Sequence, residues 1–341
     1  MNPAPLHIAV SGIPRGYHFP RPDGNWLQPA HRAQIEAISP RIQLTEIPAA
    51  AVSRQELSQF EVVLAEGGNR VHYPGELDWD DYQRFFTPAL RWVQLCSTGF
   101  SDNITPAVES GQVTLTNAPG LHTIPIAESV LAAMLDHAKN LRQRRQDQTA
   151  ELWQQRHNDE LTGRTVLIMG LGQIGSRVAQ LCAAFGMRVL GCRQRLAPVP
   201  HVETVFVLSE LKRYLPQADY VVVALPLTNL TERVLDAEAL ACLKPSTYLI
   251  NVGRGLVVDE AALITVLQEQ RIAGAYLDAL VTEPLPAGHP FWQLPNVLLV
   301  PHDSHSSPYI GDRMVDLFCA NLARYIAGDP LHHICDPKKG Y

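Results

Sequence analysis

The sequence of 341 residues has no long apolar run and no excess of positive charge. Its apolar runs, such as 220–227, are far shorter than the roughly 18 residues that a membrane span needs. With 28 Lys and Arg against 34 Asp and Glu, the net charge of −6 provides no cationic field for DNA or anionic lipid. The first residues lack the basic region and long apolar stretch of a secretory signal. We therefore expect a cytoplasmic protein with no membrane and no nucleic-acid partner.

Cysteine is scarce, with six residues scattered along the chain and no C-x-x-C pair. In a chain of this length, free buried thiols in a reducing compartment are expected rather than a disulfide framework. The His332-His333 pair has no acidic or cysteine cluster near it at ligand spacing. The sequence therefore predicts no metal site.

Short runs rich in Val, Ile and Leu alternate with longer stretches of helical period. Continuous apolar runs of this length suit parallel strands that helices cover on both faces. A prior of about 150 residues per domain predicts two domains. We therefore predict an α/β fold with parallel strands at 7–10, 62–64, 92–95, 113–115, 165–169, 188–190, 220–224, 247–251, 274–277 and 297–300.

A break at Asn117-Ala118-Pro119-Gly120 precedes a long stretch of helical period that reaches residue 141. Pro125 lies near its first turn, where a missing N–H costs nothing. Arg142, Arg144 and Arg145 follow at its expected end, where positive charge suits the helix dipole. We interpret these arginines as part of the helix end rather than as a phosphate site.

The strongest motif follows the predicted strand 165–169, which runs into Gly170-Leu171-Gly172-Gln173-Ile174-Gly175 and then into an amphipathic helix. A G-x-G-x-x-G between strand and helix is typical of a dinucleotide site. The first glycine permits a tight turn, the second lets the backbone approach a pyrophosphate, and the third allows close packing. We expect the N–H groups at the helix start, including those of Gln173 and Ile174, to hold the phosphates.

The expected second strand is followed by Cys192-Arg193-Gln194-Arg195, without the Asp or Glu that binds the ribose 2′-hydroxyl in NAD sites. A carboxylate would repel a 2′-phosphate, whereas a guanidinium can pair with it. Two solvated surface arginines are the alternative. We predict NADP(H), with NAD(H) as the second choice, and assign Arg193 and Arg195 to the 2′-phosphate.

Three later loops each place an ionisable residue after a predicted strand, namely Arg254, Glu283 and His302. Ligands bind at the carboxyl ends of the strands in an open parallel sheet, so these loops are expected to converge beside the nicotinamide. Arg binds a carboxylate and polarises the neighbouring carbonyl, His donates a proton, and Glu favours the charged form of His. Singly, each residue has an ordinary surface or packing role. Together, after a dinucleotide loop, they predict reduction of a 2-oxo acid.

An ordered series of motifs covers roughly residues 90–310. In chain order these are Ala89-Leu-Arg-Trp-Val-Gln-Leu-Cys-Ser-Thr-Gly99, Asn117-x-x-Gly120 with Ala127-Glu128, Leu161-Thr-Gly-Arg-Thr-Val166, Leu225-Pro-Leu-Thr228 with Thr231, Asn251-Val-Gly-Arg-Gly255, Leu277-Asp278, Glu283-Pro-Leu-Pro286, His289-Pro-Phe-Trp292 and Pro301-His302. In this series the chain resembles the D-isomer-specific 2-hydroxyacid dehydrogenases, especially their glyoxylate/hydroxypyruvate reductase branch.

By this resemblance, Arg254 contacts the substrate carboxylate and carbonyl, and Glu283 and His302 form the acid/base pair. Ser97-Thr98-Gly99 resembles the family's carboxylate-binding turn, with backbone N–H groups of Thr98 and Gly99 as donors. The resemblance also implies that Asp278 lies near the nicotinamide carboxamide. Further positions implied to bind the cofactor are Leu225, Pro226, Thr231 and Val252.

The resemblance further implies two similar parallel-sheet domains, Rossmann-like or flavodoxin-like, with the active site in the cleft between them. Residues 1–120 with 305–341 are expected to form the substrate-binding domain, and residues 121–304 the dinucleotide-binding domain. A homodimer is also implied.

The expected reaction is reduction of a small glyoxylate- or hydroxypyruvate-like acid to the D-2-hydroxy acid, with His302 as proton donor. Asp303 and His305 stand where the family more often has small residues, which leaves the substrate open. Phosphite oxidation, or another substrate on the same fold, is one alternative. A nucleotide-sensing binding protein, like the family's transcriptional corepressors, is another. Glu66-Gly67-Gly68-Asn69 is a candidate wall of the distal pocket, with an ordinary turn as its alternative.

Overall fold

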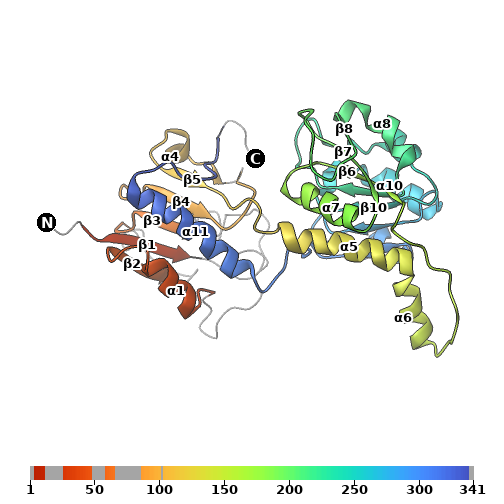
Figure 1. Cartoon of the computed structure of the whole chain (residues 1–341), viewed down its shortest axis with the longest axis horizontal. Helices are drawn as coiled ribbons and strands as arrows, with labels where there is room; N and C mark the ends of the chain where they lie inside the picture. The colour runs from red at the N-terminus through yellow and green to blue at the C-terminus, as the bar shows by residue number, and fades with distance from the viewer. Residues whose placement is uncertain (1–3, 12–25, 48–57, 66–85, 101–102, 338–341) are drawn as a thin grey trace. The chain divides into compact units, whose positions relative to one another are not determined.

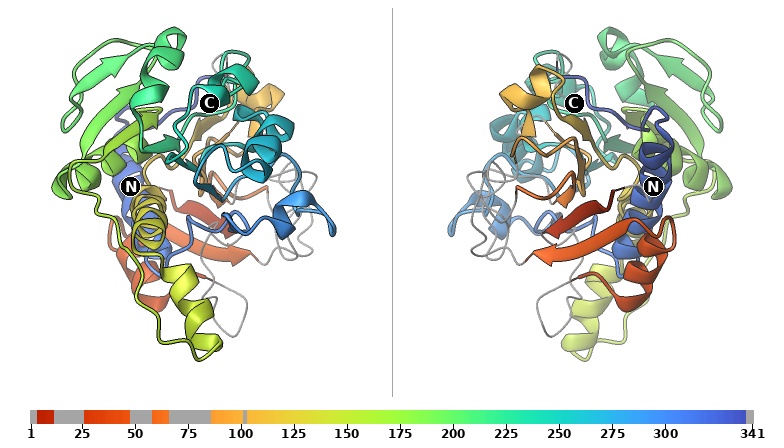
Figure 2. Two further views of the ribbon diagram at one scale, coloured as in Figure 1. Left: turned by 90° about the vertical axis from the view of Figure 1, so that its right-hand side faces the viewer. Right: turned by 90° about the vertical axis from the view of Figure 1, so that its left-hand side faces the viewer.

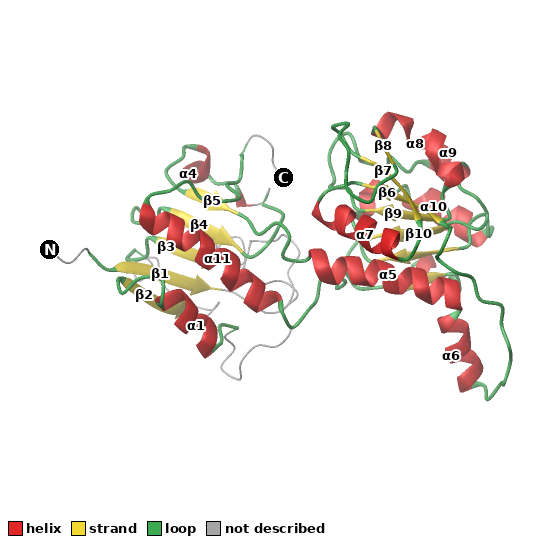
Figure 3. Cartoon of the chain, in the orientation of Figure 1, coloured by secondary structure: helices red, strands yellow, loops and turns green. Residues whose placement is uncertain are grey.

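The structure, a computed structural model, describes residues 4–11, 26–47, 58–65, 86–100 and 103–337. It contains two β-sheets, parallel throughout and covered by helices, so the predicted α/β class is confirmed (Figures 1 and 3). The chain divides into two compact units. Unit 1 comprises Met1–His122 with Ser306–Tyr341, and unit 2 comprises Thr123–His305.

The sheet of unit 2 has seven strands in the order β12-β11-β10-β9-β6-β7-β8. After β6 the chain moves outward through β7 and β8, then returns to β9 on the other side of β6. In open α/β sheets ligands bind where the strand order reverses in this way, and in this sheet the reversal lies between β6 and β9. The strands are β6 (Thr165–Met169), β7 (Arg188–Cys192), β8 (Thr204–Phe206), β9 (Tyr220–Val223), β10 (Tyr248–Asn251), β11 (Gly274–Leu277) and β12 (Val297–Leu299).

Helices cover both faces of this sheet, which explains why its strands are continuously apolar. One face packs against α5 (Thr123–Lys139) and α7 (Gln173–Ala184), with Val222 and Ile250 in that core. The other face packs against α8 (Leu211–Tyr214), α9 (Ala237–Ala241) and α10 (Glu260–Gln268), with Val221 and Leu249 in its core. Short 3₁₀ turns complete the unit: η2 (Leu208–Glu210), η3 (Leu215–Gln217), η4 (Gly255–Val257) and η5 (Pro290–Gln293).

The sheet of unit 1 has the order β2-β1-β3-β4-β5, which is that of flavodoxin-like folds. Its strands are β1 (Leu6–Ser11), β2 (Ile42–Ile47), β3 (Val62–Ala65), β4 (Trp92–Leu95) and β5 (Thr114–Thr116). One face packs against α1 (Pro29–Glu36) and the C-terminal α11 (Ile310–Ala327). The other packs against α4 (Pro106–Glu109). The C-terminal segment therefore completes the core of the N-terminal unit.

The long helix predicted to reach residue 141 ends earlier, at Lys139. Asn140 takes the left-handed conformation (φ 52°), and α6 (Leu141–Thr149) begins after it and projects from the end of α5 (Figures 1 and 2). The three arginines therefore lie on α6, and their interpretation as the end of the long helix is wrong. Arg144 still donates its Nε–H to Lys139 O (3.1 Å), whereas Arg142 donates to Val297 O (2.6 Å).

Candidate active site

The glycine loop leaves β6 at the point where the strand order reverses. Gly170 takes a positive φ of 101°, and a Cβ there would lie 2.6 Å from the carbonyl oxygen of Ala224, which follows β9. A Cβ at Gly175 would overlap the carbonyl oxygen of Gly170 and lie 3.1 Å from Ile168 Cγ2. The first glycine therefore serves the turn, and the third lets α7 approach the strand.

Gly172 is different, because a Cβ there would meet no atom within 4 Å. It is the N-cap of α7, and because glycine has no side chain, it does not cap the first N–H groups of the helix. The first N–H groups of a helix lack intrahelical acceptors, so those of Gln173 and Ile174 are available to an anion. The helix dipole adds positive potential at the same end. Open space beside uncapped N–H groups fits the pyrophosphate of a dinucleotide.

Arg193 and Arg195 follow β7, next to this loop. Gly170 N donates to Cys192 O (3.1 Å), and Arg193 N donates to Phe206 O (3.1 Å), so the backbone at the end of β7 is fixed. Arg193 is half-buried and Arg195 is exposed. Within the described ranges, neither guanidinium has a hydrogen bond or an ion pair. Two guanidinium groups that are available for ion pairing at this position are suited to binding a ribose 2′-phosphate.

The loop after β9 contains the predicted residues Leu225, Pro226 and Thr231. Thr231 is buried, and its hydroxyl donates to Pro226 O (2.6 Å) and accepts from Thr228 N (2.8 Å). Its hydroxyl therefore holds the shape of the loop rather than facing outward. A Cβ at Gly253 would lie 2.8 Å from Leu225 O, so the loop after β10 packs directly against this one.

Asn251, at the end of β10, joins two loops of the site, a role that the sequence motifs did not predict. Its side chain is buried. Its Oδ1 accepts from Gly253 N (3.1 Å), and its Nδ2 donates to Arg254 O (3.3 Å) and to Ala279 O (3.3 Å). An amide at the end of an apolar strand, directly before Val252 and a glycine, was the available signal. Asn251 therefore fixes the Arg254 loop to the loop that follows β11.

Arg254 is exposed, and its Nη1 donates to Gly253 O (2.8 Å). The next residue, Gly255, lies so close to Leu280 that a Cβ would overlap its carbonyl group. The backbone that carries the guanidinium is thus packed against the segment that leads to Glu283.

Glu283 and His302 form a hydrogen-bonded pair. Glu283 Oε1 accepts from Leu280 N (2.9 Å), and its Oε2 lies 2.7 Å from His302 Nδ1. The two side chains are 19% and 20% exposed. A carboxylate acceptor fixes the proton on Nδ1 and leaves Nε2 to face a reactant. Within the described chain Nε2 has no hydrogen-bond partner. Contacts thus run without interruption from the Arg254 loop through Leu280 and Glu283 to His302.

Asp278 lies directly after β11 and is buried. Its Oδ1 accepts from Ser304 N (3.0 Å), so it supports the loop that carries His302. Burial raises the pKa of Asp278 above its ordinary value. Val252, predicted like Asp278 to line the cofactor, is buried at the end of β10.

The predicted carboxylate-binding turn belongs to unit 1. Ser97 Oγ donates to Gly99 O (2.8 Å), and Asn117 Nδ2 donates to Thr98 O (2.6 Å). Among the described residues, no acceptor binds the backbone N–H groups of Thr98 and Gly99, which suits an anion-binding turn. The predicted pocket wall at residues 66–69 lies outside the described residues.

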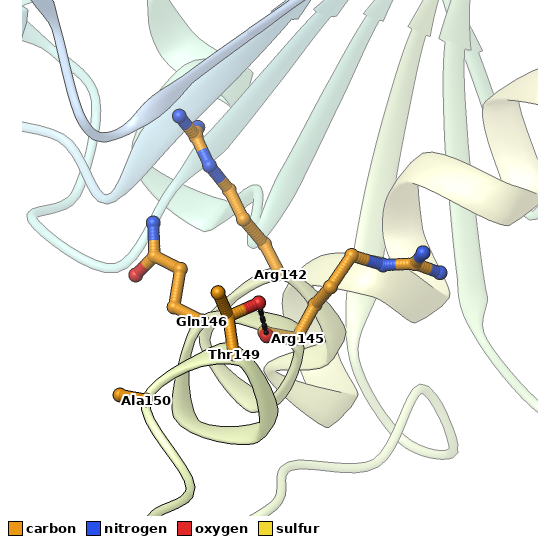
Figure 4. Close-up of a pocket in the computed structure, with 5 residues that line it drawn as sticks. All are labelled: Arg142, Arg145, Gln146, Thr149 and Ala150. Carbon is orange, nitrogen blue, oxygen red and sulfur yellow. Dashed lines mark hydrogen bonds between the residues drawn. The ribbon is translucent and has the colours of Figure 1, made fainter.

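The structure also has hollows around α6. One, of about 530 Å³, is lined by Arg142, Arg145, Gln146, Thr149 and Ala150 (Figure 4). A neighbouring one, of about 390 Å³, includes Arg142 and Trp292. None of the predicted site residues lines either hollow. In the described chain, no group of three or more His, Cys, Asp or Glu side chains could hold a metal ion, and no helix has the length and apolarity of a membrane span.

The sequence and the fold both match known proteins. Residues 131–304 match the family model described as D-isomer specific 2-hydroxyacid dehydrogenase, NAD binding domain. Glyoxylate/hydroxypyruvate reductase B of Pectobacterium carotovorum is 31% identical over 302 residues, which cover 86% of this chain and 92% of the relative.

Two solved structures cover almost the whole chain. A D-isomer specific 2-hydroxyacid dehydrogenase family protein of Aeromonas salmonicida has a TM-score of 0.79 at 27% identity and covers 98% of this chain and 99% of its own. A D-isomer specific 2-hydroxyacid dehydrogenase of Xanthobacter autotrophicus, in complex with NADPH and MES, has a TM-score of 0.76 at 26% identity and covers 99% and 100%.

Proposed function

The chain belongs to the D-isomer specific 2-hydroxyacid dehydrogenase family, and on this premise we propose that it reduces a small 2-oxo acid to the D-2-hydroxy acid with NADPH. The hydrogen bond of 2.7 Å between His302 Nδ1 and Glu283 Oε2 carries the proposal. It presents Nε2 as a proton donor, joined through the Glu283 segment to the Arg254 loop. The Pectobacterium relative is named for glyoxylate and hydroxypyruvate, which supports a substrate of two or three carbons.

In the proposed reaction, His302 donates the proton on Nε2 to the oxygen of the substrate carbonyl as negative charge develops there. Glu283 holds the imidazole in place and stabilises its charged form. Arg254 binds the substrate carboxylate and stabilises the developing alkoxide, an effect of about 3 kcal/mol for one well-placed donor. When bound, the reduced nicotinamide supplies the hydride to the carbonyl carbon.

The residues proposed to hold the cofactor are those of the glycine loop and the end of β7. Gln173 and Ile174 would donate backbone N–H groups to the pyrophosphate, and Arg193 and Arg195 would pair with the 2′-phosphate. The uncommitted state of the two guanidinium groups supports NADPH over NADH. So does the Xanthobacter neighbour, which is in complex with NADPH.

We further propose that backbone N–H groups of Thr98 and Gly99 bind the substrate carboxylate, as the family resemblance implies. The cytoplasmic location and the homodimer expected from the sequence belong to the same proposal. Sedimentation equilibrium of the purified chain would test the dimer.

The deciding experiment is steady-state turnover of a panel of 2-oxo acids, with NADPH and NADH measured side by side and phosphite included in the oxidative direction. We expect glyoxylate or hydroxypyruvate to give the highest kcat/KM, with NADPH preferred. His302→Asn should lower kcat by about 100- to 10,000-fold, to a residual rate that can still be measured, while leaving NADPH binding intact. Near-normal reduction by this variant would show that His302 is not the proton donor.

The cofactor assignment has its own test. Arg193→Ala with Arg195→Ala should raise the KM for NADPH and leave the KM for NADH unchanged, because NADH has no 2′-phosphate. Arg213→Ala, at an exposed position of α8, provides a control for the loss of positive charge. A preference of the unaltered protein for NADH would contradict the assignment.

A further inference from the structure

The loop that carries His302 is fixed at both ends to the same strand. At its start, Val300 N donates to Leu277 O in β11 (3.0 Å). At its end, Ser304 N donates to Asp278 Oδ1 (3.0 Å), directly after that strand. Between these anchors His302 takes a positive φ of 53°, a conformation that side-chain-bearing residues rarely adopt without support from their surroundings.

Ser304 is held on two further sides. Its hydroxyl lies 2.5 Å from the phenol oxygen of Tyr276, which is in β11. Its carbonyl oxygen accepts from Ser129 Oγ in α5 (3.4 Å). Ser304 and Tyr276 are both 5% exposed. If one hydroxyl is removed, water therefore has little access to form the lost hydrogen bond with the other.

The phenol is suited to a permanent hydrogen bond. Burial raises the pKa of Tyr276 to about 12, so its O–H stays protonated throughout the neutral range. The residues are 28 positions apart in the sequence, and their contact connects the interior of the strand to the segment beside His302.

The contact between Tyr276 and Ser304 bears on the candidate active site because Ser304 belongs to the loop that carries His302. The ring of His302 is directed by Glu283 at Nδ1 and by its own backbone, and the backbone is set by Val300 on one side and Ser304 on the other. Release of Ser304 would let the backbone relax from its positive φ and carry Nε2 away from the reactant. An error of about 1 Å in such a group can cost about 100-fold in rate.

We propose that the buried hydrogen bond between Tyr276 and Ser304 positions His302 for proton donation. Tyr276 and Ser304 are thus positioning residues that act through the imidazole and touch neither substrate nor cofactor. The expected effect on kcat rests on the proposed function, whereas the expected effect on the position of the His302 imidazole does not.

The test uses Tyr276→Phe and Ser304→Ala, each of which removes one hydroxyl of the pair. Each should lower kcat by about 10- to 100-fold, with the KM for NADPH unchanged. The solvent deuterium isotope effect on kcat should rise, because donation from a displaced imidazole becomes rate-limiting. Ser304→Thr, which keeps the hydroxyl, should restore most of the rate.

Tyr248→Phe is the matched control, since Tyr248 is a buried tyrosine on the neighbouring strand β10, in the same core. Within the described chain its phenol has no hydrogen bond. This variant should retain the kcat of the unaltered protein, and thermal melting of all variants should show that each is folded at the assay temperature.

Two double variants separate positioning from general damage. Both substitutions remove the bond between the two hydroxyls, but Ser304→Ala also removes a hydrogen bond of that hydroxyl to Asp278, and Tyr276→Phe also removes one between the phenol and Ser129. The double variant should therefore lose clearly less kcat than the product of the two single losses. Tyr276→Phe should cause no further loss in a His302→Asn background. An equal loss in that background, or a normal kcat and isotope effect in both single variants, would overturn the proposal.

An activity-independent measurement distinguishes this inference from the proposed function. The imidazole Cε1–H signal of His302, assigned by its absence in His302→Asn, should move in Tyr276→Phe and stay in place in Tyr248→Phe. If that signal moves but no 2-oxo acid is reduced, the proposed function fails and the positioning of His302 stands. If reduction is normal and the signal is unmoved, the positioning inference fails alone.

Discussion

Replacement of Asn251 by alanine tests whether one buried amide organises the catalytic loops. The side chain is 2% exposed and makes three hydrogen bonds, with Gly253 N, Arg254 O and Ala279 O. Each bond contributes about 1 kcal/mol net, so their loss should lower the free energy of unfolding by about 3 kcal/mol. The amide nitrogen is the part that joins the two loops.

The same change should impair the chemistry beyond its effect on stability. Without the amide, the Arg254 backbone is no longer tied to the segment after β11, and the guanidinium loses its fixed position relative to Glu283 and His302. We expect kcat/KM to fall by about 100-fold. Asn251→Asp should be at least as damaging, because it sets a carboxylate oxygen against the carbonyls of Arg254 and Ala279.

The matched control is Asn321→Ala in α11 of unit 1. Asn321 is 1% exposed and also makes three hydrogen bonds, with Gln94 Oε1 (3.0 Å), His332 O (3.1 Å) and His332 N (2.8 Å). Urea unfolding should report similar losses for both variants, whereas steady-state assays well below the melting temperature should show the loss of kcat/KM only for Asn251→Ala. Equal activity of the two variants would refute the reasoning, because Asn251 would then serve stability alone.

Two further predictions concern charge. Glu283→Gln keeps an acceptor for the Leu280 N–H but removes the charge that faces His302, so kcat should fall by about 100-fold with NADPH binding unchanged, as measured by steady-state kinetics and fluorescence titration. Burial lowers the pKa of His137, whose ring stacks on Tyr248 with centroids 4.3 Å apart. The folded state therefore binds this proton less readily than the unfolded chain, and the resulting stability is present above about pH 6.5 and lost as the pH falls through the lower folded value. His137→Phe should remove this acid-side loss in urea unfolding at pH 7.5 and 5.5, and an unchanged pH dependence would contradict it.

The strands that the sequence predicted and those that it missed differ in burial. The central strands are apolar on both faces, so short runs of Val, Ile and Leu revealed them directly. The missed strands, β2 and β8, each form one edge of a sheet, and the opposite edge strands β5 and β12 were predicted. β2 alternates between half-buried and exposed residues before a buried Ile47, so polar side chains interrupt its apolar pattern. The break at Asn140 was missed because a single left-handed residue leaves no periodic signal.

The candidate catalytic residues could be predicted because each follows a predicted strand. The hydrogen bonds that hold their loops in place could not be predicted. Arg254, Glu283 and His302 each follow a predicted strand, and parallel strands end at the same edge of a sheet. The supporting hydrogen bonds join residues far apart in sequence, such as Tyr276 with Ser304 and Asn251 with Ala279. A polar residue in an apolar strand signals a partner but does not identify it, because the partner is selected by strand order and register.

The glycine loop allows cofactor approach and packing to be separated by two substitutions. Gly172→Ala adds a methyl group where no atom lies within 4 Å, at a φ of −81° that alanine tolerates, so the free energy of unfolding should change by less than about 1 kcal/mol. The methyl group would stand where the pyrophosphate approaches, and the Kd for NADPH should rise about 10-fold or more.

Gly175→Ala should behave in the opposite way, although alanine is the better helix former by about 1 kcal/mol. Its methyl group would overlap Gly170 O, which forces α7 away from β6 and should lower the free energy of unfolding by about 1–3 kcal/mol. Urea unfolding and fluorescence titration with NADPH measure both quantities on both variants. Gly172→Ala could instead destabilise the fold as much as Gly175→Ala and leave the Kd for NADPH unchanged. That result would show that Gly172 serves the packing of the helix and not the binding of the cofactor.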